Sequence, residues 1–190
     1  MRYVSTRGQA PTLGFVVDAG RDQFRSDLRK NDHYSAGVTL RQPLTDRIGL
    51  YAALKDNVSR SDNAVFDLHD DALQLNVDYQ LSAGSAWYLN FEYRDGDIVS
   101  TSQPALAYRN VASAWINDDA FGGSQPLRDY RLKGKTALAR LGYNLALKGN
   151  SSIDISWRYA RSVSNLAPGY GASAIKYVGN QFSIDYLMGF

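Results

Sequence analysis

The chain alternates strictly between apolar and polar residues, and this pattern recurs about eight times along its length. The clearest run is residues 73–81, LQLNVDYQL, in which every odd-numbered position is apolar or aromatic and every even-numbered position is polar. A period of two is typical of a β-strand whose two faces lie in different environments. The sequence therefore predicts eight strands, centred on residues 12–20, 34–40, 48–55, 73–81, 87–94, 137–147, 153–160 and 181–190.

Two kinds of connection join these runs. Short connections rich in turn-forming residues, such as SAGS at 82–85 and LKGNS at 147–151, alternate with long polar ones. An up-and-down antiparallel meander has this arrangement, with short turns at one end and long loops at the other. The longest connection, about residues 96–129, is too long for a passive link. It either folds down as a cap, binds a partner, or extends its flanking strands as a hairpin.

Two architectures accommodate eight meandering strands. A soluble barrel, such as a lipocalin, turns its apolar face inward, whereas a membrane barrel turns it outward to lipid. Here the apolar faces are almost free of charge over about nine residues per strand, the span that a tilted membrane strand needs. Aromatic residues near the ends of these faces would form interfacial girdles: Tyr34, Tyr79, Trp87, Tyr93, Tyr143, Trp157, Tyr159 and Tyr186. We therefore expect an all-β, closed, antiparallel, up-and-down, eight-stranded transmembrane barrel over residues 11–190, after a segment or linker at 1–10.

The C-terminal stretch QFSIDYLMGF carries one wholly apolar, largely aromatic face, made of Phe182, Ile184, Tyr186, Met188 and Phe190. This pattern resembles the last strand of Gram-negative outer-membrane β-barrel proteins, which typically ends in Phe with apolar residues alternating back from it. The resemblance implies location in the outer membrane and recognition by the barrel-assembly machinery. It also implies a small eight-stranded barrel similar to the transmembrane domain of outer-membrane protein A.

The opposite face of the predicted strands is polar, and an eight-stranded lumen is only wide enough to be filled by side chains. Near balance between inward acids and bases favours a salt-bridge network that plugs the lumen, since an unpaired buried charge is very costly. Pairing through the LKGNS turn predicts Arg140 beside Arg158, with Glu92 and Asp185 as carboxylate partners. A narrow, porin-like polar path is the alternative. The predicted network comprises Asp18, Lys55, Asp78, Glu92, Arg94, Arg140, Asp154, Arg158 and Asp185.

Basic residues extend one strand beyond its apolar band. If Ala137 and Leu141 face lipid, a period of two sends Arg131, Lys133 and Lys135 outward as well, just above that band. There they would contact the phosphates of lipopolysaccharide through charge-assisted hydrogen bonds. A stretch that reaches into solvent, or a β-bulge that changes the register, is the alternative. Cations of the first long loop would extend the same belt: Arg25, Arg29 and Lys30.

Composition limits the chemistry. The chain has no cysteine, which excludes disulfides, thiolate metal sites and cysteine nucleophiles, and its net charge of +2 gives no reason to expect nucleic-acid binding. Catalysis on lipid A would need His33 or His69 beside a serine, and nothing in the sequence forces that geometry. Carboxylates beside His69, or at Asp118 and Asp119, could bind a divalent cation, but such pairs are usually only solvated. No catalytic residue, metal or cofactor is therefore predicted.

The expected function is a non-enzymatic barrel that supports envelope integrity or surface interaction through its long loops. Its expected partners are outer-membrane lipid, lipopolysaccharide, the assembly machinery and a surface partner for the 96–129 loop. One alternative is a narrow transport path. Another is the C-terminal barrel of a larger export or secretion protein, since MRYVST followed by RGQAP is compatible with the end of an earlier strand and a turn. A lipid A-modifying acyl hydrolase is the third.

Overall fold

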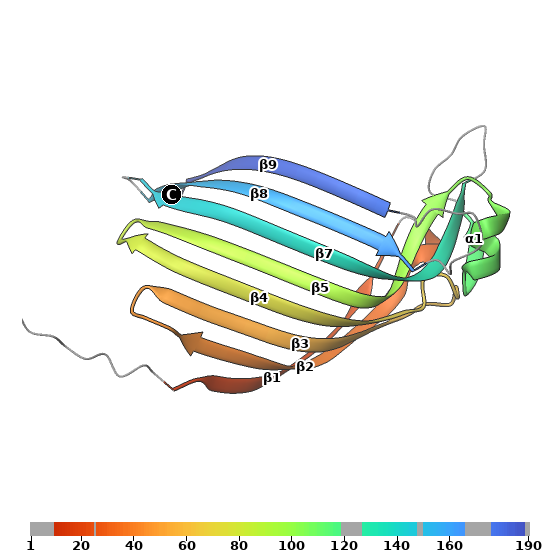
Figure 1. The fold of residues 1–190 in the computed structure, drawn as a ribbon, viewed down its shortest axis with the longest axis horizontal. Helices are drawn as coiled ribbons and strands as arrows, with labels where there is room; N and C mark the ends of the chain where they lie inside the picture. The colour runs from red at the N-terminus through yellow and green to blue at the C-terminus, as the bar shows by residue number, and fades with distance from the viewer. Residues whose placement is uncertain (1–9, 25, 119–126, 148–149, 166–175, 189–190) are drawn as a thin grey trace, which may run out of the picture.

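The computed structural model describes residues 10–24, 26–118, 127–147, 150–165 and 176–188. They form one antiparallel sheet in which successive long strands pair, in the order β1-β2-β3-β4-β5-β7-β8-β9 (Figure 1). The short strand β6 pairs with β7. The predicted all-β, antiparallel, up-and-down fold is confirmed. The strands are β1 Thr12–Asp22, β2 Asn31–Pro43, β3 Ile48–Arg60, β4 Leu68–Ser82, β5 Ser85–Ser102, β6 Ala114–Asn117, β7 Arg128–Ala146, β8 Ser151–Ser164 and β9 Lys176–Met188.

Each predicted strand corresponds to one of the long observed strands, but the observed strands extend further at the loop end. Strand β5 has 18 residues and β7 has 19, and together they form a hairpin that projects past β8, which pairs with β7 only from Gly134 onward. Beyond that point β6 takes the place of β8 against residues 128–131 of β7. The connection predicted at 96–129 therefore begins only after β5 ends, and it contains the helix α1 Leu106–Val111 as well as β6.

Side-chain oxygens fix the short turns at the other end. The hydroxyl of Thr45 accepts hydrogen bonds from the backbone N–H groups of Arg47 and Ile48, at 3.1 and 3.0 Å. Between β4 and β5 the hydroxyl of Ser82 accepts from the N–H of Gly84 at 3.3 Å, and between β7 and β8 Asn150 has a φ of 57°, a conformation that asparagine tolerates better than most residues. Because turn geometry sets hairpin register, these contacts help to determine which residues share each face.

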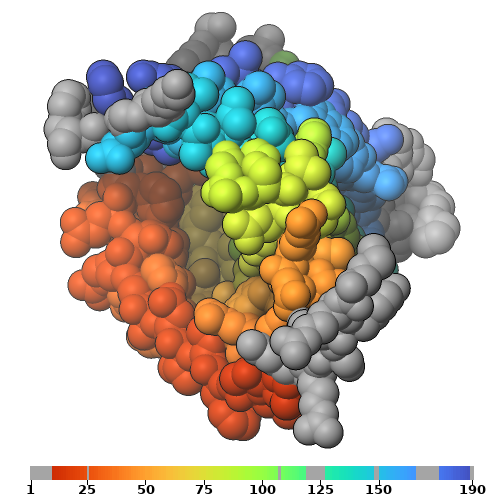
Figure 2. Space-filling view, turned by 90° about the vertical axis from the view of Figure 1, so that its left-hand side faces the viewer, coloured from red at the N-terminus to blue at the C-terminus, as the bar shows by residue number. Residues whose placement is uncertain are grey.

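The described sheet is open. Its two edge strands are β1 and β9, and no backbone pairing joins them within the described residues. The sheet is nevertheless strongly curved, and its strands surround a hollow when viewed from the end that carries the short turns (Figure 2). The closure predicted from the sequence is thus not reached, and the ninth strand β6 was not predicted. The eight long strands leave β1 and β9 running in opposite directions.

Buried apolar residues are few and lie mainly at the loop end. Val65, Phe66, Tyr130 and Leu132 are all at most 7% exposed, and they come from the β3–β4 connection and from the projecting part of β7. Along the rest of the sheet the large apolar side chains are exposed or half-buried. The hydrophobic core of the described chain is therefore a small cluster at one end, not a layer along the sheet.

Candidate functional site

The outer face of the sheet is a continuous apolar wall. One register row runs across five strands through Phe15, Val38, Leu54, Leu73 and Tyr93. Phe15 is 89% exposed and Leu54 is 58% exposed, although both are large and apolar. A contiguous exposed apolar surface of this extent is unusual for a soluble monomer and indicates contact with another apolar phase or partner.

Aromatic residues mark both margins of this wall. Near the short turns Trp87 lies opposite Tyr143, with ring centroids 4.9 Å apart, and near the loops Tyr93 lies on the same face of the same strand. Six residues separate Trp87 from Tyr93, which corresponds to about 20 Å along a strand. With a strand tilt of about 35–45° this separation projects to about 15 Å along the membrane normal, which lies inside the roughly 25 Å apolar band of transmembrane barrels.

The inner face is polar and contains one well-defined cluster around Asp154. Its carboxylate Oδ1 accepts a hydrogen bond from the hydroxyl of Tyr88 at 2.7 Å and pairs with Nη2 of Arg140 at 3.0 Å. The guanidinium of Arg140 also lies 5.2 Å from the centre of the Tyr88 ring. Gly142 makes room for that ring, because a Cβ atom there would lie 2.1 Å from Cζ of Tyr88.

The nine residues predicted to plug the lumen do not form one network. Arg140 lies opposite Arg158 as predicted, but it pairs with Asp154 and not with Glu92 or Asp185. Glu92 instead pairs with Arg94, and Asp18 lies 3.3 Å from Nε2 of His33. In the described part of the chain, the remaining four predicted members form no ion pair: Lys55, Asp78, Arg158 and Asp185.

Polar cavities follow the inner face from the turns to the loops. The largest, about 950 Å³, opens at the turn end and is lined in part by Tyr51, Asn76 and Asp78. Two further cavities lie in the middle of the inner face, and both are lined by Arg140 and Arg158. A fourth cavity reaches the loop end. Neighbouring cavities share lining residues, so the described inner face has room for water along most of its length.

Three connections meet at the loop end around one arginine, and we call the four residues in contact there the loop cap: Arg29, Phe66, Asp118 and Asp129. Nη2 of Arg29 lies 3.0 Å from a carboxylate oxygen of Asp118 and 3.0 Å from one of Asp129. Both carboxylates are almost completely buried, and the guanidinium also lies 5.2 Å from the Phe66 ring. Arg29 is thus not part of the basic belt expected outside; Lys30 pairs with Asp27, and Arg25 lies outside the described residues.

The aromatic residues of the β5–β7 connection divide between a contact with buried Tyr130 and the surface. Tyr108 of α1 packs edge-on against Tyr130, with centroids 5.9 Å apart. Trp115 is 38% exposed, and the guanidinium groups of Arg109 and Arg128 lie 4.9 and 4.6 Å from its ring. The described part of this connection therefore folds against the sheet and still presents an aromatic and basic surface. Phe121, also noted in the sequence, lies outside the described residues.

The three cations predicted above the apolar band behave differently from one another. Arg131 donates to the carbonyl oxygen of Asp67 and to the hydroxyl of Ser113, so its side chain is held against neighbouring loops and is only 21% exposed. Lys133 and Lys135 point outward and are more than half exposed. They lie 3.0 Å from Asp97 and 3.5 Å from Asp95, respectively, both on β5. No β-bulge interrupts β7 at these positions.

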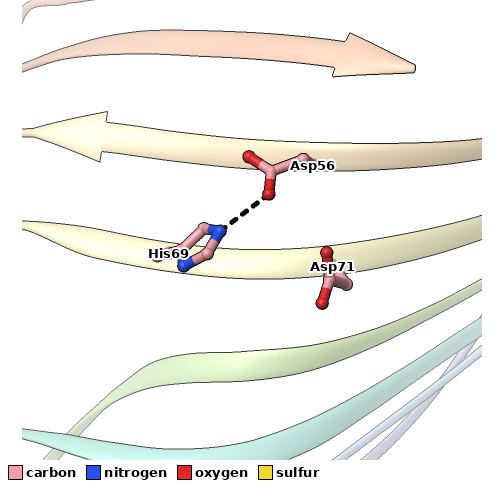
Figure 3. A group of neighbouring side chains, drawn as sticks. All are labelled: Asp56, His69 and Asp71. Carbon is pink, nitrogen blue, oxygen red and sulfur yellow. Dashed lines mark hydrogen bonds and ion pairs between the residues drawn. The ribbon is translucent and has the colours of Figure 1, made fainter.

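A histidine and two aspartates meet on the outer face at the loop ends of β3 and β4 (Figure 3). Nε2 of His69 lies 2.8 Å from a carboxylate oxygen of Asp56, and Asp71 is close enough that the three residues could each offer one ligand to a cation. All three are exposed, so water would have to complete such a coordination shell. The sequence indicated only carboxylates beside His69 as a possible cation site. In the structure Asp71 shares the outer face of β4 with His69, and Asp56 joins them through the β3–β4 register.

The ion pair with Asp56 changes the acidity of the imidazole. Hydrogen bonding to Asp56 raises the pKa of His69, and the charges of Asp56 and Asp71 act in the same direction. We predict that Asp56→Ala lowers this pKa toward the ordinary histidine value, measured by following the imidazole protons by NMR. Because the folded-state pKa is raised, the pair stabilises the fold at low pH, and that contribution disappears as the pH rises through the folded-state pKa. An unchanged titration of His69 in the Asp56→Ala variant would contradict this assignment.

Both histidines are paired with aspartates in the described structure. The two ring nitrogens of His33 lie 3.3 Å from Asp18 and 3.3 Å from Asp22, and His69 is paired with Asp56. Ser59 lies opposite His33 in the register, but no hydrogen bond joins these side chains among the described contacts. The nucleophile–base contact that a hydrolase needs is therefore not among the interactions of the described residues.

Comparison with known proteins provides no further guide to the site. No protein-family model, no curated protein and no solved structure matches the chain. Within the described residues no helix is long and apolar enough to cross a membrane.

Proposed function

We propose that the chain forms a transmembrane β-barrel of a Gram-negative outer membrane, with its apolar wall in lipid and its polar face toward the lumen. One observation carries this proposal: the large apolar side chains are on the outside of a curved sheet whose inside is polar. A soluble barrel needs the opposite arrangement, because its apolar face must leave water. The C-terminal strand supports the same proposal through its resemblance to outer-membrane barrels.

Closure of the sheet belongs to this proposal. The side chains at the two edges are the most exposed of the wall, with Phe15 at 89% and Phe182 at 79%, whereas Leu89 in the middle is 38% exposed. Open strand edges are not tolerated in a bilayer, because their backbone groups would find no hydrogen-bond partner. Strands β1 and β9 run in opposite directions, so they can pair directly and complete an eight-stranded barrel.

In this proposal the loop cap and the surface around Trp115 carry the biological role, which is envelope integrity or surface interaction without catalysis. The barrel holds three connections at one end. The buried ion pairs of Arg29 join two of them, and the contact of Arg29 with the Phe66 ring adds the β3–β4 connection. A rigid support for exposed loops is a common use of small barrels.

Refolding tests the proposal. The urea-unfolded chain is expected to acquire β-sheet circular dichroism only when detergent micelles are present, and to migrate differently on an SDS gel before and after boiling. The first result follows if detergent must cover the apolar wall. The second follows if the closed barrel stays folded in SDS until it is boiled. A chain that folds equally well in plain buffer would refute the membrane assignment and favour a soluble barrel.

Two alternatives have specific support. The series of polar cavities and the unpaired inner charges favour a narrow transport path, which would appear as single-channel conductance in planar bilayers. The open edges are also compatible with a larger barrel of an export protein, in which further strands separate β1 from β9. Cysteines placed on β1 and β9 would form a disulfide in the eight-stranded barrel, and they would stay apart in the larger one.

A further inference from the structure

Four basic residues gather on the outer face where β7, β8 and β9 leave the apolar wall. Lys135 and Lys176 lie in one register row, with Val163 between them. Arg161 lies in the neighbouring row, between Ala137 and Val178. Lys133 completes the group one step further toward the loops. We call Lys133, Lys135, Arg161 and Lys176 the basic patch.

The charges of the basic patch are only partly compensated. Asp97 and Asp95 of β5 pair with Lys133 and Lys135. Hydrogen bonding to Tyr93, together with the charge of Asp95, raises the pKa of Lys135, so this lysine stays positively charged near neutral pH. Arg161 and Lys176 are both exposed and form no ion pair among the described residues. A net positive charge therefore remains on the β8–β9 side of the patch.

We propose that the basic patch binds the phosphate monoester of an anionic lipid headgroup. This inference rests on the proposed function, in which the apolar wall lies in the bilayer. Below Arg161 on the same face come Tyr159, opposite Asn180, and then Trp157, opposite Phe182, so acyl chains would cover mainly aromatic side chains there. A phospholipid of this kind therefore fits both parts of the site, its phosphate at the cations and its acyl chains on the apolar wall. Free phosphate would contact only the cations. The guanidinium of Arg161 can hold two phosphate oxygens, and the lysines add point charges.

The patch differs from the belt expected from the sequence. Arg131 was expected in that belt, but its side chain contacts Asp67 and Ser113 instead of facing outward. The patch contains Arg161 and Lys176 in its place. The outer face of β3–β5 at the same height carries the acids Asp56, Asp71, Asp95 and Asp97 with His69. That acidic side would repel phosphate, so lipid binding should be restricted to one sector of the wall.

Native mass spectrometry of the detergent-folded protein can test this. The probes are phosphatidic acid, whose headgroup is a phosphate monoester, and phosphatidylcholine with the same acyl chains. Wild-type protein is expected to retain phosphatidic acid preferentially. The double variant R161Q/K176Q is expected to bind it roughly tenfold to thirtyfold more weakly, with phosphatidylcholine binding unchanged.

The matched control is R21Q/R60Q, which also removes two cations from the outer face at the loop end, where each is paired with an aspartate. Retention of phosphatidic acid by this control supports a local site. An equal loss in both variants would overturn the local site in favour of general charge attraction. Full competition by millimolar inorganic phosphate would overturn the lipid assignment. Failure of wild-type protein to fold in detergent would instead refute the proposed function, so the two failures are distinguishable.

Discussion

Replacing Arg29 by alanine is expected to release the loop cap from the sheet. The substitution leaves Asp118 and Asp129 buried without the cation that lies 3.0 Å from each of them. Removing one partner of a buried charge pair typically costs about 3–5 kcal/mol, since the remaining charge is neither solvated nor neutralised. The loss should be local. Amides of β6 and of residues 128–132 should exchange with deuterium much faster, while amides in the middle of β3, β4 and β5 should keep their protection.

Two further variants separate charge from shape in this prediction. Arg29→Lys keeps a positive charge near the carboxylates but loses the two-armed guanidinium, so we expect partial protection of the same amides. Arg21→Ala breaks an exposed pair with Asp32, which water and salt already screen, so it should leave the exchange of the same amides almost unchanged. If the amides of β6 and of residues 128–132 exchange at the same rate in Arg29→Ala as in Arg21→Ala, the loop cap does not depend on its buried ion pairs.

The cap was not predictable from the sequence because its contacts are long-range. Arg29 and Asp129 are 100 residues apart, and nothing in the local pattern around either residue indicates the other. The sequence suggested only that the long connection would fold down, bind a partner or extend as a hairpin. The structure has the hairpin extension, with α1 and β6 folded onto it.

The strands and their faces were predictable because a period of two is a local property. It placed Leu73 outside and Asp78 inside, and the LKGNS turn was enough to place Arg140 opposite Arg158. The partner of Arg140 was not predictable in this way. Its long side chain leans along the sheet and reaches Asp154, four positions from Arg158, where Tyr88 also donates a hydrogen bond. Register specifies backbone neighbours, whereas side chains of this length select partners from several rows.

The same difference between backbone register and side-chain contacts explains why Arg131 is not exposed with Lys133 and Lys135. Period two correctly gives it the same face as Lys133 and Lys135. However, the β3–β4 connection and the segment before β6 fold back beside this part of β7, and Asp67 and Ser113 hold the guanidinium there. A strand pattern predicts the side from which a residue emerges, but not what the neighbouring loops place over that side.

The largest effect on the whole sheet is expected from a charge placed on the apolar wall. Val77 and Asn76 are neighbours in β4, and they belong to opposite faces: Val77 lies between Leu50 and Leu89 on the wall, and Asn76 lines the inner cavities. If the wall lies in lipid, Val77→Arg should lower the free energy of unfolding in bilayers by about 2–4 kcal/mol. Urea titration of the protein folded into phosphatidylcholine vesicles, monitored by tryptophan fluorescence, would measure this change.

Asn76→Arg is the matched control, because it adds the same side chain one residue away on the same strand. Its guanidinium would enter a polar, cavity-lined face two residues from Asp78, so its cost in bilayers should be much smaller than that of Val77→Arg. The order of the two costs decides which face meets lipid. In a soluble barrel an arginine on the water-exposed outer face would be nearly neutral, and the arginine inside would be the more damaging. The comparison therefore tests the orientation of the sheet directly, and it does so whether the barrel closes through β1 and β9 or through additional strands.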